Sequence, residues 1–498
     1  MSDDTFPFVV GRAVAEHRSW PRMLVDAAAW SNVADRLGGG TLTLLALWGE
    51  TKAVHMAVAD PADAARIVVL SLSCSDGQYP SVGRVHPPAI RLERAIVDLS
   101  RLTPVGLPDA RPWLDHGLWG TSDDRAAEKY RFLPVEGDNL HQVPVGPVHA
   151  SVIEPGHFRF TADGETIVRV EERLGYTHKG LENLLQGADL ERAARLAGRC
   201  SGDSTVAYAL AFSLAVEAAL DWAVPARAVW LRALMAELER LANHLGDVGA
   251  ICNDASFAIM HAHCAVLRER VLRGSAACFG HRLMMDRVVP GGVTVALDAA
   301  GATRIAALVA DLRRRFKPLV DLYDKTASLQ DRTVGAGMLR PALAAQFAVG
   351  GYVGRASGRR CDARRWPGYA PYDQLAFEVP VLEEGDVNAR LWIRVHEVEQ
   401  SIRLIEQILA RLPEGPIWAA RRGAANGVAE SMALVEGFRG DILAWVRIGA
   451  DGLVARCHFR DPSWFQWPLL EAAIEGNIIA DFPLCNKSFN CSYSGHDL

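Results

Sequence analysis

The hydrophobic pattern at the start of the chain predicts a small domain of mixed strands and helices. Residues 41–48 and 53–59 are rich in Leu, Val and Ala, and Gly-Glu-Thr-Lys separates them, so we expect two paired strands joined by a turn. Residues 61–72 follow Asp60, a residue type that caps helices, and we expect a short helix there. A Pro- and Gly-rich stretch over 104–120 then predicts the end of this domain.

Helical periodicity dominates the second part of the chain. Residues 157–170 predict a β-hairpin with its turn at Asp163-Gly164. Residues 228–251 and 398–412 carry apolar side chains at helical spacing, and the second of these helices is expected to stop at a proline. Residues 442–448 predict a strand.

These patterns predict an α+β chain of two domains. Residues 1–120 are expected to form a small N-terminal domain, residues 121–145 a linker, and residues 146–498 a mainly α-helical bundle with small β appendages. The last 60 residues are expected to be short strands and loops. If the first domain is only a scaffold, residues 146–498 are expected to fold without it.

Composition narrows the classes of function. The 498 residues are 50% hydrophobic and 22% charged, which is typical of a globular protein with more than one domain. The formal charge of −6 argues against nucleic acid as the main partner. The best candidate for a spanning segment, 207–216, is too short to cross a bilayer, and the Met-Ser-Asp-Asp-Thr start does not resemble a signal peptide. Any membrane association is therefore expected to depend on partners.

Cysteine usage indicates reduced thiols. The chain has nine cysteines, and no two of them form a Cys-x-x-Cys pair. An odd and scattered set in a long chain favours a reducing compartment over a disulfide framework. Their positions are 74, 200, 252, 264, 278, 361, 457, 485 and 491.

Several segments combine titratable residues with glycine or proline, and each alone has an ordinary structural explanation as a turn or a charged helix surface. Together they follow one another in a characteristic order. The segments are Gly-Pro-Val-His (146–149), Glu-Pro-Gly-His-Phe-Arg-Phe (154–160), Arg-Leu-Gly-Tyr-Thr-His-Lys-Gly-Leu-Glu (173–182), Glu-Leu-Glu-Arg-Leu-Ala-Asn-His-Leu-Gly-Asp (237–247), Gly-His-Arg (280–282), Asp-Arg-Val-Val-Pro-Gly-Gly (286–292) and Gly-Asp-Val-Asn-Ala-Arg (385–390).

With these segments, residues 146–498 closely resemble the large subunit of membrane-bound, energy-converting nickel–iron hydrogenases. They equally resemble the homologous quinone-site subunit of respiratory complex I, also called its D-type subunit. The first domain resembles, more weakly, the complex I C-type subunit, through Glu93-Arg94, Asp98, residues 108–111 and residues 115–120. That resemblance implies a domain that docks neighbouring subunits and carries no chemistry.

The hydrogenase resemblance implies a nickel–iron centre only where four cysteines are present, because soft thiolates hold both metals. The family supplies them in two motifs, Arg-x-Cys-Gly-x-Cys and, near the C-terminus, Asp-Pro-Cys-x-x-Cys. The residues at the four ligand positions of this chain are Ser201, Ser204, Ser492 and Gly495. A serine hydroxyl does not replace a bridging thiolate, and Cys200 and Cys491, each one residue away, supply only two. Nickel is therefore not expected.

The resemblance also assigns candidate site residues. Tyr176 matches the tyrosine that holds the quinone headgroup in complex I, while the partner histidine of that site falls near Glu154 and is missing. Glu154 matches a carboxylate that relays protons in hydrogenases, and Asp254 matches a carboxylate coupled to the missing histidine. Arg282 matches an arginine beside the neighbouring iron–sulfur cluster. We expect folding to bring Glu154, Tyr176 and Asp254 together with His178 in one proton-linked pocket.

The combined hypothesis is a subunit of a complex I-like, hydrogenase-related oxidoreductase. An iron–sulfur cluster is expected on a small partner subunit of complex I B-type, a quinone is an expected ligand, and this chain is expected to hold no cofactor firmly. Other hydrophilic and membrane subunits would hold it at the cytoplasmic side of the inner membrane. Two alternatives stay open: a true hydrogenase with unusual ligands, and a non-catalytic coupling subunit.

Overall fold

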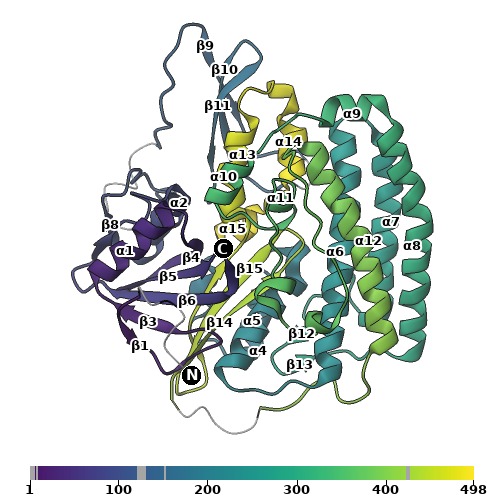
Figure 1. Cartoon of the computed structure of the whole chain (residues 1–498), viewed down its shortest axis with the longest axis horizontal. Helices are drawn as coiled ribbons and strands as arrows, with labels where there is room; N and C mark the ends of the chain where they lie inside the picture. Colours follow the sequence, from purple (N-terminus) through teal and green to yellow (C-terminus); the bar gives the residue numbers. More distant parts are fainter. Residues whose placement is uncertain (1–5, 7–8, 120–129, 151–152, 422–426) are drawn as a thin grey trace.

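The computed structural model describes residue 6 and residues 9–119, 130–150, 153–421 and 427–498, and it has mixed α and β structure (Figure 1). The N-terminal part holds one five-stranded sheet in the order β1-β3-β6-β5-β4. The helices and strands of this N-terminal part are β1 (Arg12–Ala13), β2 (His17–Arg18), β3 (Arg22–Val25), α1 (Ala27–Gly38), β4 (Thr43–Glu50), β5 (Ala53–Asp60), β6 (Asp63–Ser73), β7 (Gln78–Pro80), α2 (Ile90–Ser100) and β8 (Thr103–Val105).

The predicted strand pair of this domain is confirmed, and the predicted helix is wrong. Strands β4 and β5 are antiparallel and join through the expected turn. The segment predicted to be a helix after Asp60 is instead β6, a central strand that pairs with β5 on one side and β3 on the other. Its run Ile67-Val68-Val69-Leu70 is buried on both faces of the sheet, and such a continuous apolar run does not distinguish strand from helix.

The C-terminal part carries most of the helices. Its strands are β9 (Leu140–Val145), β10 (His157–Asp163), β11 (Thr166–Arg173), β12 (Val288–Val289), β13 (Gly292–Val293), β14 (Ala429–Glu436), β15 (Asp441–Ile448) and β16 (Val454–Arg460). Its helices are α3 (Leu181–Leu185), α4 (Leu190–Ala197), α5 (Thr205–Ala219), α6 (Ala226–Asp254), α7 (Ala258–Phe279), α8 (Ala299–Lys325), α9 (Ala327–Thr333), α10 (Pro341–Gln346), α11 (Gly351–Arg355), α12 (Val387–Arg411), α13 (Ser463–Ile474), α14 (Phe482–Phe489) and α15 (Tyr493–Asp497).

The long helices α6, α7, α8 and α12 pack into the bundle that the periodicity predicts (Figure 1). The predicted hairpin is β10–β11, and the predicted strand in the last part of the chain is β15. The expectation of short strands and loops over the last 60 residues is correct for β15 and β16 and wrong for the segment after them, which contains the helices α13, α14 and α15. Together these elements confirm the α+β class.

The two parts of the chain pack through their sheets. Helices α1 and α2 cover one face of the N-terminal sheet, while Trp48, Ala57 and Val69 on the other face pack against Met432 and Trp445 of the C-terminal sheet. Helix α5 covers the far side of β14 and β15. The apolar composition of β4, β5 and β6 follows from this arrangement, because these strands are buried on both faces.

Backbone and ionic contacts reinforce this interface. Strand β2, from the start of the chain, extends the C-terminal sheet by pairing in parallel with β14. Arg22 of the N-terminal sheet forms a buried ion pair with Glu430, and Arg447 of β15 reaches back to Glu50 at 2.8 Å. Removing the first domain would therefore expose apolar and charged groups, and we expect residues 146–498 to be unstable without it.

The connector is only partly a linker. Residues 140–145, which the sequence places in the linker, form β9, the third strand of the β10–β11 sheet. Residues 120–129, which span the predicted boundary, lie outside the described residues. In the part of the chain that the structure describes, no helix is both long enough and apolar enough to span a membrane.

Candidate functional site

The four positions at which the hydrogenase family places its thiolates lie together in space. Ser201 comes just before α5 and Ser492 just before α15, yet their hydroxyl oxygens are 3.0 Å apart and share a hydrogen bond. The Ser492 hydroxyl also caps α15 by accepting a hydrogen bond from the backbone N–H of Gly495 at 2.9 Å. We call Ser201, Ser204, Ser492 and Gly495 the serine site. Both serines are buried, so this is an interior site.

A carboxylate and a guanidinium complete the serine site. The hydroxyls of Ser201 and Ser204 both donate to Asp203, at 2.8 and 3.3 Å, and Arg439 binds the same carboxylate through two nitrogens at 2.8 and 2.6 Å. Burial by itself would raise the pKa of Asp203, but the charge and hydrogen bonds of Arg439 outweigh it and lower that pKa to about 2. The site therefore holds a fixed ion pair near neutral pH.

The Gly495 position leaves no room for a side chain. A Cβ atom on Gly495 would lie 2.4 Å from a carboxylate oxygen of Asp461 and 2.9 Å from the Ser492 hydroxyl. Asp461 is itself held in place, because it accepts hydrogen bonds from the Tyr208 hydroxyl at 2.5 Å and from the backbone N–H of Ser463 at 2.8 Å. A cysteine at this fourth position would require Asp461 to move.

The two nearby cysteines are buried neutral thiols. Cys200 is fully buried, and burial holds its pKa well above the usual value. Burial likewise raises the pKa of Cys491, whose sulfur lies 3.9 Å from the side-chain oxygen of Gln466. Neither environment favours the thiolate form that a metal requires.

The residues present do not fit a nickel–iron centre. The donors at the ligand positions are hydroxyl groups that already bind one another, the adjacent carboxylate is neutralised by Arg439, and the fourth position has no side chain. Soft thiolate ligands, which a nickel–iron pair needs, are missing from all four positions. Within the described ranges, no three His, Cys, Asp or Glu side chains are grouped closely enough to hold a metal ion.

Two of the predicted site residues contact the C-terminal segment that carries the serine site. A carboxylate oxygen of half-buried Glu154 accepts a hydrogen bond from the backbone N–H of Ser494 at 3.2 Å. His178 lies 2.7 Å, through its Nδ1 atom, from the backbone carbonyl of Asp497. Both side chains therefore contact α15, the short helix that Ser492 caps.

The other three predicted residues are Tyr176, Asp254 and Arg282, and each has its own surroundings. Tyr176 is 39% exposed, and its ring contacts that of His116 with 4.4 Å between centroids. Asp254 ends α6 and is half-buried, and burial raises its pKa. Arg282 lies on the surface and pairs with Glu269 at 2.8 Å. No contact among the described residues joins Asp254 or Arg282 directly to Glu154, so the single proton-linked pocket stays a prediction.

The sequence did not single out Arg439, Asp461 or Asp497. Asp497 fixes the loop that carries Tyr176, because its carboxylate accepts hydrogen bonds from the backbone N–H groups of Gly175 and Thr177, both at 2.9 Å. No motif marks Arg439, which lies between Phe438 and Gly440 in the turn that joins β14 to β15. For Asp461 and Asp497, only the folded chain shows the partners.

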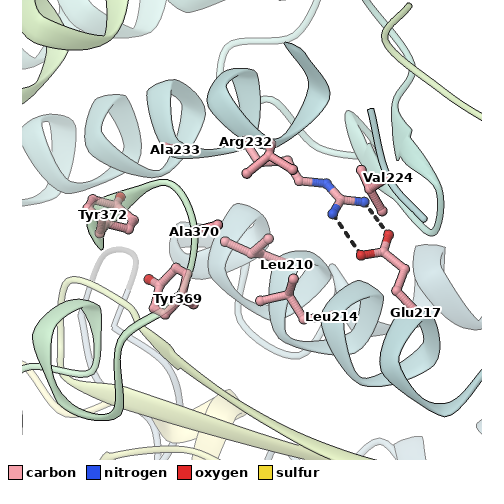
Figure 2. A pocket seen from close by; sticks show the side chains of 10 residues that line it. Leu210, Leu214, Glu217, Val224, Arg232, Ala233, Tyr369, Ala370 and Tyr372 are labelled. Carbon is pink, nitrogen blue, oxygen red and sulfur yellow. Dashed lines mark hydrogen bonds and ion pairs between the residues drawn. The ribbon is translucent and has the colours of Figure 1, made fainter. Parts of the chain in front are cut away.

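A separate cavity of about 270 Å³ lies between α5 and α6 (Figure 2). Figure 2 shows aliphatic side chains such as Leu210 and Leu214 along its wall, and Glu217 bound to Arg232 through two hydrogen bonds at one end. Because the two charges neutralise each other, the cavity suits a small uncharged molecule. None of the five predicted site residues lines it.

Comparison with known proteins identifies the relatives of the chain. Residues 254–427 match the family described as the 49 Kd subunit of respiratory-chain NADH dehydrogenase. Residues 179–246 match the family described as nickel-dependent hydrogenase. The hydrogenase match includes the Ser201 and Ser204 segment.

Individual relatives span most of the chain. Formate hydrogenlyase subunit 5 of Escherichia coli is 32% identical, over 86% of this chain and 79% of that protein. The carbon monoxide-induced hydrogenase of Rhodospirillum rubrum is 30% identical, over 71% of this chain and 98% of that protein. The C/D subunit of the NADH-quinone oxidoreductase of Bacteroides thetaiotaomicron is 26% identical, over 81% of this chain and 82% of that protein.

A solved structure agrees with the fold. A chain of the membrane-bound sulfane sulfur reductase, an archaeal respiratory membrane complex, superposes with a TM-score of 0.68 at 26% identity, over 74% of this chain and 100% of that one. The extent of the 32% identical relative and this superposition confirm the predicted resemblance. The chain belongs to the family that unites the large subunits of membrane-bound nickel–iron hydrogenases with the 49 Kd, D-type subunit of respiratory complex I.

Proposed function

We propose that this chain is the large subunit of a complex I-like, hydrogenase-related membrane complex that works without nickel. In this role it receives electrons from an iron–sulfur cluster on a small B-type partner subunit and delivers them to a quinone or another small acceptor. Membrane subunits couple that reaction to ion translocation, and the chain is attached peripherally at the cytoplasmic side of the inner membrane.

The observation that carries the proposal is the chemistry of the serine site. Its hydroxyls hydrogen-bond to each other at 3.0 Å and to Asp203, which Arg439 neutralises. This arrangement supports a family member that keeps the fold of a hydrogenase and lacks its ligands. Redox chemistry then needs electrons from a cluster on a partner and an acceptor that does not have to bind to nickel.

Exposed apolar groups in the segments that carry Glu154 and Tyr176, and in the segment before Trp119, support a partner at these places. Leu118, Ile153 and Tyr176 are 85%, 53% and 39% exposed, and each is large and apolar for a surface position. Trp119, next to Leu118, packs its ring against His178 at 4.7 Å. A B-type subunit that covers this surface would bring its cluster close to Tyr176, which would then face the acceptor. Glu154, which follows Ile153 in the chain, is the proposed proton donor.

The acceptor can be tested among three chemical classes. Quinones follow from the complex I relatives, and protons, reduced to hydrogen, follow from the hydrogenase relatives. Sulfane sulfur is the substrate named for the similar archaeal complex. A second candidate function, a non-catalytic coupling subunit, is favoured by the serine site itself, since its polar groups already bind one another.

The test uses the intact purified complex with reduced dyes as electron donor. We expect reduction of a quinone or a sulfane sulfur compound and, in a parallel assay with oxidised dye and hydrogen, no dye reduction. Glu154→Gln preserves shape but carries no proton, so it is expected to lower turnover about tenfold or more while the complex assembles normally. Glu165→Gln, at an exposed position of the β10–β11 hairpin, is the matched control and is expected to leave turnover unchanged.

Each other result contradicts a stated part of the proposal. Hydrogen-dependent dye reduction would establish the hydrogenase alternative. An assembled complex that reduces none of these acceptors would establish the coupling subunit. Normal turnover in Glu154→Gln would remove Glu154 from the proton path.

A further inference from the structure

A cleft of about 300 Å³ lies where the N-terminal sheet meets the C-terminal part of the chain. Strands β4, β5 and β6 form one wall, and residues 359–367 with β14 form the other. We call it the interdomain cleft. It is separate from the serine site and from the cavity of Figure 2, because it shares no lining residue with either of them.

The floor of the interdomain cleft is apolar and its mouth is aromatic. Leu45, Ile67 and Leu434 line the floor, and the latter two are buried. Trp366 lies at the opening and is 39% exposed, although it is one of the largest apolar side chains. An exposed indole over an apolar floor provides a surface on which a ring or an acyl chain can pack.

The carboxylates that line the cleft are all paired with arginines. Asp362 binds Arg364 at 2.7 Å, and Glu436 binds Arg355 at 2.8 Å. The other two carboxylates follow the same pattern, Asp441 with Arg460 and Asp60 with Arg66. The Cys361 thiol is neutral near pH 7, because burial raises its pKa to about 11. None of these groups therefore leaves a free negative charge to attract a cation.

Two positive charges at the cleft lack such partners. Arg359 is half-buried, and its guanidinium donates one hydrogen bond, to the backbone carbonyl of Val349 at 2.9 Å. Arg360 is exposed, and no hydrogen bond or ion pair to it occurs among the described residues. A guanidinium has five N–H donors in a planar fork that suits carboxylate, sulfonate and phosphate groups.

We propose that the interdomain cleft binds a small amphipathic anion, with its acidic group on Arg359 and Arg360 and its apolar body between Trp366 and the floor. The volume of the cleft is at the lower end of the range of ligand-pocket volumes. It suits a fused ring or a medium-length chain rather than a whole lipid. Because both domains line the cleft, such a ligand also holds them together. This site does not depend on the redox role proposed above.

The experiment is isothermal titration of the full chain with 2-naphthoate and, separately, with decanoate. Both probes carry a carboxylate, so the two arms distinguish an aromatic from an aliphatic source of the same chemistry. Binding of either probe is expected, and the double variant Arg359→Gln with Arg360→Gln is expected to weaken it about tenfold or more, since it removes charge-assisted hydrogen bonds.

The control is Arg365→Gln, which removes one positive charge from the same segment, where the double variant removes two. Arg365 is exposed, donates to the backbone carbonyl of Phe377 at 2.8 Å and does not line the cleft, so affinity is expected to stay unchanged. Trp366→Ala is expected to weaken the binding of 2-naphthoate more than the binding of decanoate. No binding of either probe at millimolar concentration, or equal losses in the cleft variants and Arg365→Gln, would overturn the proposal.

Discussion

At the scale of single residues, Gly495 determines how closely the C-terminal helix approaches Asp461. Replacing it with alanine puts a methyl group 2.4 Å from a buried carboxylate oxygen that Tyr208 also holds. We expect Gly495→Ala to lower the free energy of unfolding by about 1–3 kcal/mol, the usual range for overpacking. Urea unfolding of the purified chain, followed by tryptophan fluorescence, measures this.

Gly202→Ala is the control for this prediction. Gly202 also belongs to the serine-site segment, but no atom lies within 4 Å of its added Cβ, so the change is expected to stay within about 0.5 kcal/mol. Equal unfolding midpoints for the two variants would show that Asp461 moves freely, and a cysteine at position 495 would then fit.

Asp203 gives a pH dependence with a definite sign. Its pKa is about 2 in the folded chain and near 3.8 when unfolded, so the ion pair with Arg439 stabilises the fold above pH 4. That stability is lost as the pH falls from about 4 to about 2. The Asp203 side chain is 35% exposed and water screens part of the effect, so we expect a loss of about 1 kcal/mol.

The check compares urea unfolding of the wild type and Asp203→Asn at pH 6 and at pH 3. The difference between the two proteins is expected to shrink at pH 3, where the wild-type carboxylate begins to protonate. A difference that is constant or grows toward low pH would contradict the assigned ion pair.

The sequence assigns individual site positions only where a motif aligns its residues with those of the family. The order of Arg, Ser, Gly and Ser over 199–204 placed Ser201 and Ser204 at ligand positions, and the structure brings Ser201 next to Ser492. Arg439 and Asp461 belong to no such motif. Their roles depend on which strand ends meet the C-terminal segment, and local sequence does not contain that information.

At the scale of secondary structure, the predicted helices and most predicted strands are present, and the errors lie in helix bounds and in one strand. Helix α6 extends slightly beyond its predicted bounds, whereas α12 starts at Val387, 11 residues before the predicted start at 398, because Asp386 caps it. The sequence predicts a helix in place of strand β6, because two-sided burial removes the alternation that marks a strand. Helices α14 and α15 are too short to be stable alone and rely on tertiary contacts such as those of Asp497.

Strand β15 provides a test of how tightly the two sheets are joined. Trp445 is fully buried, and its ring centroid lies 5.5 Å from those of Trp48 and His55 across the interface. Trp445→Ala is expected to cost about 3–5 kcal/mol in urea unfolding, as large core truncations do. Leu118→Ala, at an 85% exposed position, is expected to change stability by less than about 0.5 kcal/mol. Similar effects from both variants would mean that the sheets barely depend on each other.

At the scale of the whole molecule, both domains support the serine site. Trp113, near the end of the first domain, donates its indole N–H to His496 at 3.3 Å, and His496 in turn contacts Asp497 at 2.9 Å. The first domain therefore contributes to the position of α15, which carries Gly495. This dependence differs from the sequence-based view of a scaffold that only docks neighbours.

The most direct test of the central claim is the nickel content of the purified complex, measured by inductively coupled plasma mass spectrometry against the protein concentration. We expect nickel to be far below stoichiometric, because hydroxyls and a glycine occupy the four thiolate positions and Arg439 already neutralises Asp203. Iron from the partner's clusters is expected in the same sample. About one nickel atom per chain that persists through gel filtration would contradict the account.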